Sequence, residues 1–350
     1  MRTSATNRHA MMCSRFMHNV LVTGAAGFIG SHVARYLHAA GYRVLALDDL
    51  SGGFQDQVPL GVTFVAGSVT DHVLVDRLFR DNAFTYVFHL AAYAAEGLSP
   101  FIRRFNYETN LIGSMAVLNA AVNAAVTVKC FVFASSIAVY GHAAAPMREE
   151  TTPVPADPYG ISKYAVELDL AQAHEMFGLD YIVFRPHNVY GEHQHLGDPY
   201  RNVVGIFMRQ LMHGEPLTIF GDGSQTRAFS YIDDVAPIIA RSIERPDCYN
   251  TVYNIGGDQP CSVMELAQAV GRALGVTPTV RCLPARSEVL HAFASHDKVR
   301  RVFGDMVLNV PLDEGLSRMA AWAKATGARP KSRFSNIEIA KGLPSLWTEP

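Results

Sequence analysis

The sequence lacks the features that define several classes of protein. Its 30 lysines and arginines nearly balance its 32 aspartates and glutamates, so the formal net charge is −2. No basic stripe is present, and we expect no nucleic-acid partner. No apolar run approaches the roughly 20 residues of a membrane span, so we also expect no membrane association. Residues 1–18 hold three arginines and no apolar core, which predicts a disordered extension rather than a secretory signal.

Cysteine is scarce as well. The five cysteines are scattered without the spacing of metal ligands: Cys13, Cys130, Cys248, Cys261 and Cys282. Such thiols fit a reducing compartment, and we expect a cytoplasmic protein. The chain has 14 histidines, but His193 and His195 have no cysteine or carboxylate cluster beside them at ligand spacing. The sequence therefore predicts no metal site.

What is present in the first half of the 350 residues is an alternation of apolar strands and helical patterns. The predicted strands are 19–23, 43–48, 62–66, 86–90, 129–134 and 181–185. The predicted helices are 28–40, 71–80, 105–125 and 159–177. Continuous apolar strands between helices form a parallel sheet that is covered on both faces. We therefore predict an α/β fold with a Rossmann-type doubly wound parallel sheet over residues 19–186 that binds its ligand outside the carboxyl ends of its strands.

Glycine and proline interrupt the chain more often after Arg185. Helical patterns remain at 203–213, 232–244, 263–274 and 313–326. This change predicts a smaller mixed α/β substrate-binding region over residues 187–330, interleaved with the first domain. Residues 331–350 are predicted to be a tail.

A strand that runs into three glycines and then into a helix predicts a dinucleotide site at residues 20–30. Gly24 permits a tight turn, Gly27 lets the backbone approach the phosphates, and Gly30 lets the helix pack against the strand. The next predicted strand ends in Asp48, about 20 residues further on. A carboxylate there accepts hydrogen bonds from a ribose 2′-hydroxyl and repels a 2′-phosphate. The predicted cofactor is therefore NAD rather than NADP.

Hydroxyl and amine side chains follow at positions where such a sheet presents its ligand. Ser135 and Ser136 come directly after the strand 129–134, at the carboxyl edge of the sheet. Tyr159 and Lys163 are four residues apart at the start of a helix, so they share one face. An ammonium beside a phenol favours phenolate, and a tyrosine tuned in this way acts as a general base. We predict that Ser136, Tyr159 and Lys163 are catalytic, with Ser136 holding the substrate oxygen.

Together these motifs resemble those of the extended short-chain dehydrogenase/reductase family of nucleotide-sugar epimerases and dehydratases. The resemblance covers roughly residues 20–304. Its marks are Thr23–Gly30, Asp48, His89–Ala92, Tyr107–Asn110, Ser135–Ser136, Tyr159–Lys163, Arg185–Gly191 and Gly221–Arg227. The resemblance implies tightly held NAD, a nucleoside-diphosphate sugar as substrate, and the catalytic set named above. It also implies a homodimer formed through helices 105–125 and 159–177.

The resemblance places further residues at the cofactor. These are Phe28, Ile29, Ser68, Val69, Leu90, Ala91, Ala92, Asn110 and Ser135, together with Tyr159 and Lys163. The family usually has an acid that contacts adenine where this chain has Ser68. Because a serine is the weaker acceptor, adenine recognition is expected to depend on Val69 and the backbone.

The two residues after Ser136 bear on the reaction. The family's 4,6-dehydratases have an Asp-Glu pair there, its UDP-glucuronate decarboxylases have a glutamate, and its GDP-mannose 3,5-epimerases have a cysteine at the second position. This chain has Ile137 and Ala138, and neither can move a proton. Elimination and proton exchange at ring carbons therefore lack their acid and base. We expect a 4-epimerase, in which Tyr159 takes the C4-hydroxyl proton as hydride passes to NAD⁺ and then returns to the opposite face of the sugar.

Substrate contacts are expected in the second half of the chain. By resemblance, Asn188 lies at the diphosphate and Arg227 pairs with a phosphate, a role that suits a guanidinium. Asn202 begins a helix whose N-terminus offers backbone donors. The family usually has an arginine and an acid three residues apart that contact phosphate and ribose. Here Arg286 and Glu288 are two apart, which leaves their roles open, and a solvated surface charge is the alternative for Arg227 and for Arg286.

Glu96 and His187 are expected near the sugar. A carboxylate at Glu96 binds a sugar hydroxyl but disfavours an anionic C6 group, which favours interconversion of UDP-glucose and UDP-galactose; a loop carboxylate that faces water is the alternative. UDP-glucuronate or an N-acetylated UDP-hexose, or another NAD-dependent dehydratase or reductase reaction, are the other enzyme hypotheses. An idle dinucleotide-sensing protein on the same fold is the hypothesis from another class. The presence of Ser136, Tyr159 and Lys163 together argues against it.

Overall fold

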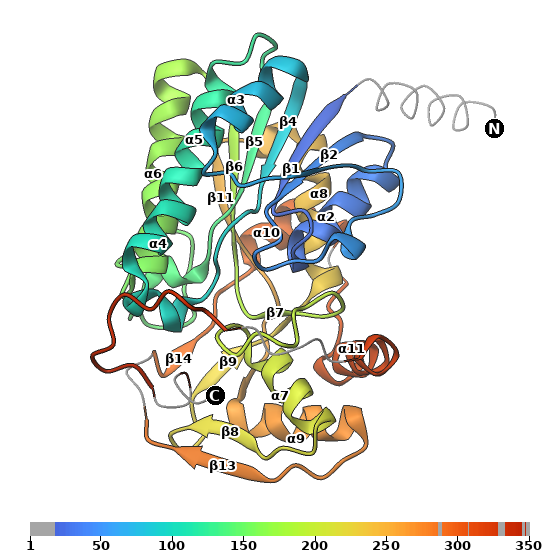
Figure 1. The fold of residues 1–350 in the computed structure, drawn as a ribbon, viewed down its shortest axis with the longest axis vertical. Helices are drawn as coiled ribbons and strands as arrows, with labels where there is room; N and C mark the ends of the chain where they lie inside the picture. Colours follow the sequence, from blue (N-terminus) through green and yellow to red (C-terminus); the bar gives the residue numbers. More distant parts are fainter. Residues whose placement is uncertain (1–17, 286–288, 307, 328–332, 345–346, 348–350) are drawn as a thin grey trace, which may run out of the picture.

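A seven-stranded parallel sheet forms the centre of this computed structural model (Figure 1). The structure describes residues 18–285, 289–306, 308–327, 333–344 and 347. The strand order is β11-β6-β5-β4-β1-β2-β3. The strands are β1 (Asn19–Thr23), β2 (Arg43–Asp48), β3 (Thr63–Ala66), β4 (Phe84–His89), β5 (Cys130–Ala134), β6 (Tyr181–Pro186) and β11 (Thr251–Ile255). This order confirms the predicted Rossmann-type fold, and it reverses between β1 and β4, where such sheets bind their ligand.

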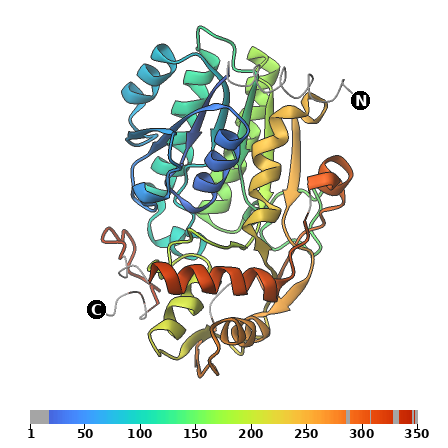
Figure 2. The ribbon, with the colours of Figure 1, turned by 90° about the vertical axis from the view of Figure 1, so that its right-hand side faces the viewer.

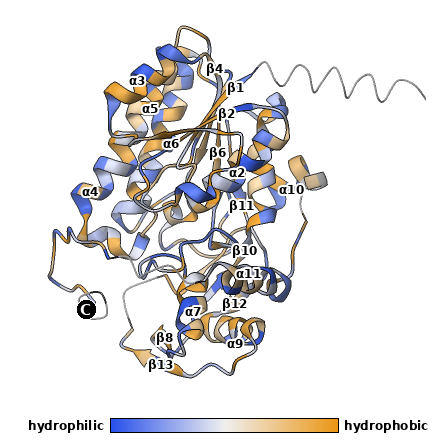
Figure 3. Ribbon diagram, turned by 45° about the vertical axis from the view of Figure 1, so that its right-hand side comes forward, coloured by the Kyte–Doolittle hydropathy of each residue, from blue (hydrophilic) through white to orange (hydrophobic). Residues whose placement is uncertain are grey.

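Helices cover both faces of this sheet (Figures 1 and 2). One face carries α3 (His72–Asp81), α5 (Gly113–Val122) and α6 (Pro158–Phe177). The other face carries α2 (Phe28–Ala39), α8 (Ala236–Arg241) and α10 (Asp297–Phe303). Successive strand residues point to opposite faces, so Leu21 joins the first core and Val20 the second. In Figure 3 the central strands are largely hydrophobic, whereas a surface helix such as α3 carries both kinds of residue.

The central sheet takes one strand from the second half of the chain. β11 pairs in parallel with β6, from Thr251 against Ile182 to Ile255 against Pro186. Sequence analysis did not predict this strand, because five residues that are only partly apolar stand between Asn250 and Gly256 in a segment rich in turn formers. α8 and α10 also pack on the sheet, so residues 187–330 contribute to the first domain as well as to the smaller region.

Two predicted helices are interrupted in the structure. The helix expected over 105–125 consists of α4 (Arg103–Tyr107), the π-helical turn η3 (Glu108–Ile112) and α5. The helix expected over 232–244 consists of η5 (Ile232–Asp234), α8 and η6 (Ser242–Glu244). Pro237 lies in the first turn of α8, where a missing N–H is tolerated, so a helix starts there rather than continuing through.

The smaller region lies beyond the carboxyl ends of the strands, in the lower part of Figure 1. Its helices are α7 (Val203–Met212), α9 (Val263–Leu274) and α11 (Leu312–Thr326). Short strands pair between them: β7 (Val189–Tyr190) with β10 (Ser230–Tyr231), β8 (Leu217–Phe220) with β13 (Val280–Leu283), and β9 (Thr226–Ala228) with β12 (Pro260–Ser262) and β14 (His291–Ala292). The remaining short helices are η1 (Gln55–Gln57), η2 (Glu96–Phe101), η4 (Ile137–Tyr140), η7 (Pro246–Cys248) and η8 (Gly304–Met306).

The two ends of the chain differ from one another. Residues 1–17 of the expected extension lie outside the described residues. The segment expected to be a tail instead packs on the domain in its described part, because Phe334, Ile337, Leu343 and Trp347 join a cluster that contains Tyr93 and Tyr200. Across the described ranges, no helix combines the length and the apolar character needed to cross a membrane.

Candidate active site

The glycine turn after β1 is shaped for a phosphate. Gly24 has a φ of +69°, and a Cβ there would lie 2.7 Å from the backbone nitrogen of Ala91. A Cβ on Gly30 would overlap the carbonyl oxygen of Gly24, so α2 packs against the turn only without one. Gly27 precedes α2 and offers no side-chain cap, which leaves the first N–H groups of the helix for an anion. These features fit the pyrophosphate of NAD.

Asp48 ends β2 beside this turn. One carboxylate oxygen accepts a hydrogen bond from the backbone of Ala26 (3.0 Å), and the other accepts one from Leu50 (2.7 Å). Burial raises the pKa of this carboxyl, and these two bonds oppose the rise. Asp48 is therefore held rigidly where the ribose hydroxyls of a dinucleotide are expected. At the end of β3, the hydroxyl of Ser68 lies 2.9 Å from that of Thr70, while Val69 is buried.

Buried polar side chains fix the segment that follows β4. Thr23 Oγ1 accepts hydrogen bonds from the backbone of Leu90 and Ala91 (3.2 Å each) and lies 2.8 Å from His89 Nδ1. Asn110 binds both backbone groups of Tyr93, accepting from its nitrogen (2.7 Å) and donating to its oxygen (3.1 Å). This inward side chain lies in the π turn between α4 and α5, and π turns of this kind occur often at functional sites. The predicted cofactor residue Asn110 thus shapes the loop that leads to Ala92 and Glu96.

The structure brings the predicted catalytic residues together. Ser136 follows β5, while Tyr159 and Lys163 lie on the first turns of α6, which Asp157 caps through the backbone of Gly160 (2.9 Å). The Lys163 amine lies 5.8 Å from the centre of the Tyr159 ring and donates to the Ala134 carbonyl oxygen (2.7 Å). Only 8% of Tyr159 and 2% of Lys163 is exposed, so both groups react in a largely dry environment.

Burial dominates the electrostatics of this set. It raises the pKa of the Tyr159 phenol above its ordinary value, and the carboxylates of Glu96 and Asp157 add to the rise. A hydrogen bond with Ser136 opposes it. Burial also lowers the pKa of Lys163 to about 7, which the nearby Glu167 opposes. Tyr159 therefore needs added positive charge to become a base, and a bound nicotinamide cation would supply it.

A buried ion pair holds the helix that carries two of the predicted catalytic residues. Arg185 on β6 donates through Nε to the Glu167 carboxylate on α6 (3.0 Å) and through Nη1 to the Tyr140 hydroxyl (2.7 Å). Ser135 donates to the same carboxylate, and Tyr140 donates to Asn254 on β11 (2.8 Å). This network joins β5, β6 and β11 to the helix that carries Tyr159. Glu167 was not singled out from the sequence, although it lies one turn beyond Lys163.

Three of the predicted substrate residues lie around β7 and β9. Asn188, at a φ of +41°, donates to the carbonyl oxygen of Ala228 (3.1 Å). Asn202 caps α7 by accepting from Val204 (3.0 Å) and donates to the carbonyl oxygen of Val189. The Arg227 guanidinium donates to three carbonyl oxygens, at 2.6 to 3.0 Å. Arg286 and Glu288 lie outside the described residues.

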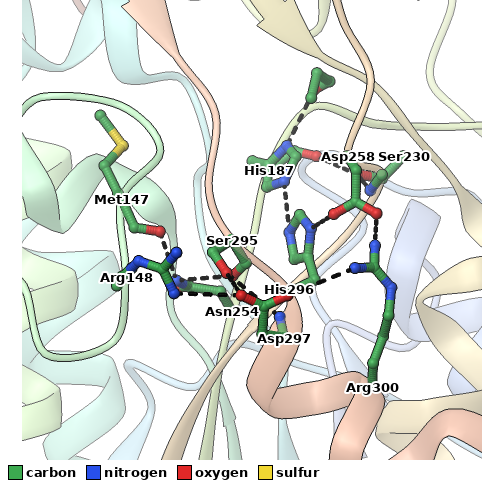
Figure 4. A network of polar contacts seen from close by, with 12 residues as sticks. Met147, Arg148, His187, Ser230, Asn254, Asp258, Ser295, His296, Asp297 and Arg300 are labelled. Atoms are coloured by element: carbon green, nitrogen blue, oxygen red, sulfur yellow. Dashed lines mark hydrogen bonds and ion pairs between the residues drawn. The ribbon is translucent and has the colours of Figure 1, made fainter.

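His187 faces the protein interior (Figure 4). It is 3% exposed, its Nδ1 donates to the Ala228 carbonyl oxygen (3.0 Å), and its Nε2 lies 2.9 Å from Nε2 of His296. Burial lowers the pKa of His187 to about 3, so the ring is neutral at ordinary pH. Both ring nitrogens have partners within the protein, so neither is available to bind a sugar hydroxyl unless these contacts change.

Two residues of opposite charge, Glu96 and Arg201, act on the Tyr159 phenol. Glu96 is exposed at the start of η2, and its charge acts on the phenol. Arg201 comes from the loop before α7; it pairs with Asp198 (2.6 Å) and lies over the Tyr93 ring, 4.9 Å from its centre. A Cβ on Gly52 would lie 2.6 Å from the Arg201 guanidinium. Arg201 was not predicted from the sequence, in which it stands as a positively charged residue directly before the predicted helix cap Asn202.

The glycine turn, the buried carboxylate at the end of β2 and the Ser136–Tyr159–Lys163 set fit an enzyme that uses a dinucleotide to act on a hydroxyl group. The chain matches the model described as the NAD dependent epimerase/dehydratase family over residues 20–256, and it belongs to that family.

Similar proteins agree with this assignment. A UDP-glucose 4-epimerase of Mycolicibacterium smegmatis is 33% identical over 309 residues, which cover 85% of this chain and 96% of that one. The crystal structure of a Thermotoga maritima UDP-glucose 4-epimerase with UDP-glucose has a TM-score of 0.83 at 34% identity and covers 88% of this chain and 99% of that one. A Bacillus cereus UDP-glucuronic acid 4-epimerase, solved with UDP-glucuronic acid and NAD, has a TM-score of 0.80 at 26% identity, covering 88% and 100%. The chain is an NAD-dependent enzyme of the isomerase class.

Proposed function

We propose that the protein is a nucleotide-sugar 4-epimerase that interconverts UDP-glucose and UDP-galactose. The observation that carries this proposal is the pairing of a complete Ser136–Tyr159–Lys163 set with Ile137 and Ala138 immediately after Ser136. Such a site can take and return the proton of a hydroxyl group. It has no acid or base at those two positions to eliminate water or to exchange a carbon-bound proton.

Each side chain of the site has one proposed role. Bound NAD supplies the acceptor and donor of hydride. Ser136 holds the C4 oxygen of the sugar, and Tyr159 removes the hydroxyl proton and later returns it to the oxygen. Lys163 favours the phenolate by its charge, and the dry surroundings of both groups strengthen this effect. Asn188, Asn202 and Arg227 are proposed to hold the diphosphate.

A panel of nucleotide sugars tests the proposal. The purified chain is incubated separately with UDP-glucose, UDP-galactose, UDP-glucuronate and UDP-N-acetylglucosamine, and the products are separated by chromatography. We expect UDP-glucose and UDP-galactose to reach the same mixture from both directions without added NAD. The proposal fails if neither of these two sugars yields its C4 epimer. The Tyr159→Phe variant serves as the control for a contaminating epimerase.

A second candidate is the 4-epimerisation of UDP-glucuronate. The observation that favours it is Arg201, whose guanidinium lies over Tyr93 and whose charge acts on Tyr159. A guanidinium is the side chain best suited to a C6 carboxylate. Glu96 opposes this reading, because its negative charge acts on the same phenol. Formation of a C4 epimer from UDP-glucuronate alone would establish the second candidate.

We further propose that the enzyme is a cytoplasmic homodimer. α5 and α6 pack against one another, and apolar side chains on this part of the surface are exposed: Ile112, Ile161 and Leu168. An apolar face of this kind favours a two-fold interface between identical helices. Light scattering of the purified chain tests the dimer, and an Ile161→Glu/Leu168→Glu variant is expected to be a monomer.

A further inference from the structure

His187 belongs to a chain of polar side chains that also contains His296, Asp258 and Arg300 (Figure 4). Its ring is stacked with that of His296, with ring centres 5.0 Å apart. His296 Nδ1 lies 2.7 Å from the Asp258 carboxylate, and Asp258 forms an ion pair with Arg300 on α10. His187 and His296 are 3% and 1% exposed. The chain therefore joins the segment after β6, the loop after β11 and α10; its two rings are buried, whereas the Asp258 and Arg300 side chains are each about one-third exposed.

The other end of this chain meets the two segments that carry proposed substrate residues. His187 Nδ1 (3.0 Å) and Asn188 Nδ2 (3.1 Å) donate to the same acceptor, the carbonyl oxygen of Ala228. Ala228 follows Arg227 directly on β9. The ring of His187 thereby connects the turn that holds Asn188 to the strand that holds Arg227.

A second link fixes the backbone of His187 itself. Its carbonyl oxygen accepts from the Ser230 hydroxyl (2.9 Å), which in turn accepts from the backbone of Gly257 (2.9 Å). Gly256 also lies against the ring, since a Cβ there would lie 2.8 Å from His187 Nε2. The ring and the backbone of His187 are thus held by separate contacts. Together these contacts fix the position of the Ala228 carbonyl group, to which the ring donates.

We propose that His187, held by His296, Asp258 and Arg300, is a positioning residue that sets the spacing of Asn188 and Arg227 for the diphosphate of the substrate. The inference deepens the proposed function and rests on it. Because His187 lies behind the binding residues and not beside the reacting atoms, its loss weakens binding and leaves the chemical step unchanged. Loss of one buried hydrogen bond is worth about 1.4 kcal/mol, which corresponds to a tenfold change in affinity.

The test compares two substitutions of His187 with a matched control. His187→Phe keeps the ring volume and removes the bond to Ala228, whereas His187→Asn keeps a donor near the position of Nδ1. His32→Phe is the control, because His32 is also buried, lies 3.0 Å from a backbone oxygen (that of Glu192) and packs against a second histidine, His193. Each variant is assayed for kcat, KM for UDP-glucose, NAD content, and Kd for UDP by calorimetry.

For His187→Phe we expect KM and the Kd for UDP to rise about tenfold, with kcat and NAD content within about twofold of the wild type. His187→Asn is expected to restore most of the affinity, and His32→Phe to leave it unchanged. Should His187→Phe not fold, His296→Gln gives the same test from the second ring. Unchanged UDP binding in a folded His187→Phe or His296→Gln variant, or a fall in kcat alone, overturns the inference. A wild-type chain that binds no UDP overturns the proposed function and this inference with it.

Discussion

At the scale of single residues, the Tyr159 phenol determines whether the proposed reaction takes place. Its replacement by phenylalanine removes one oxygen and keeps the buried ring, so the local packing is retained. We expect Tyr159→Phe to lower kcat at least about 100-fold, as loss of a general acid–base group does, while NAD remains bound. Epimer formation and the NAD released on denaturation measure the two effects. An unchanged rate would remove Tyr159 from the mechanism.

Lys163 gives a second prediction at this scale. Burial lowers its pKa to about 7 in the folded chain, from the ordinary value of 10.5. Between these two values the unfolded chain binds the proton and the folded chain does not, so the free energy of unfolding rises with pH across this window. We expect Lys163→Met to be more stable than the wild type at pH 7 and the difference to shrink toward pH 10. Urea unfolding of the NAD-free proteins measures it, and a difference that grows with pH would contradict the assignment.

At the scale of elements, the ion pair of Glu167 and Arg185 joins α6 to β6. Both side chains are buried, at 5% and 4% exposure. Removing one charge leaves the other buried without a partner, which costs about 3–5 kcal/mol, whereas replacing both charges by apolar groups is often close to neutral. We expect Glu167→Gln to be strongly destabilising and Glu167→Leu/Arg185→Met to be less so. Urea unfolding measures the free energy of unfolding of both variants. A double variant that is less stable than Glu167→Gln would contradict this account.

The secondary-structure elements also show which features of the molecule can be predicted from its sequence. Strands and helices of the first half follow from continuous apolar runs, and the position of Tyr159 and Lys163 on one helix face follows from their spacing of four residues. The roles of Asn110 and His187 do not follow from spacing, because each is decided by a partner far along the chain: Tyr93 for Asn110, and His296 for His187. β11 was not predicted because it, too, depends on a distant partner: it pairs with β6, which lies about 70 residues earlier in the chain.

At the scale of the whole molecule, the C-terminal segment connects the two halves. Phe334 packs against Tyr93 (ring centres 5.4 Å apart) and Trp347 against Tyr200 (5.5 Å). The Glu338 carboxylate accepts from the backbone of Arg104 and Phe105 (2.8 and 2.9 Å) at the start of α4. Deletion of residues 333–350 is expected to cost about 2–4 kcal/mol, from lost apolar burial and a lost helix cap. Calorimetry measures the lower Tm, and an unchanged Tm would show that these contacts add nothing.

Buried histidines predict how the whole molecule responds to acid. Burial lowers the pKa of His32, His89 and His187 to about 3. Below pH 6.5 the unfolded chain takes up these three protons and the folded chain does not, so the free energy of unfolding falls as pH falls. Each histidine then costs about 2 kcal/mol at pH 5, and three of them cost about 6 kcal/mol, comparable with the whole stability of an ordinary domain.

Three aspartates that are buried or partly buried, Asp48, Asp157 and Asp234, oppose this slope, because burial raises their pKa and the folded chain binds their protons first. This opposing uptake lies above their ordinary pKa of 3.8, whereas the histidines of the unfolded chain take up protons from about pH 6.5 downward. We therefore expect Tm to fall steeply between pH 6.5 and 5. The Tm of the His32→Gln variant is expected to fall less, because this variant has one buried histidine fewer. A Tm that stays constant across this window would mean that these rings are protonated in the folded chain.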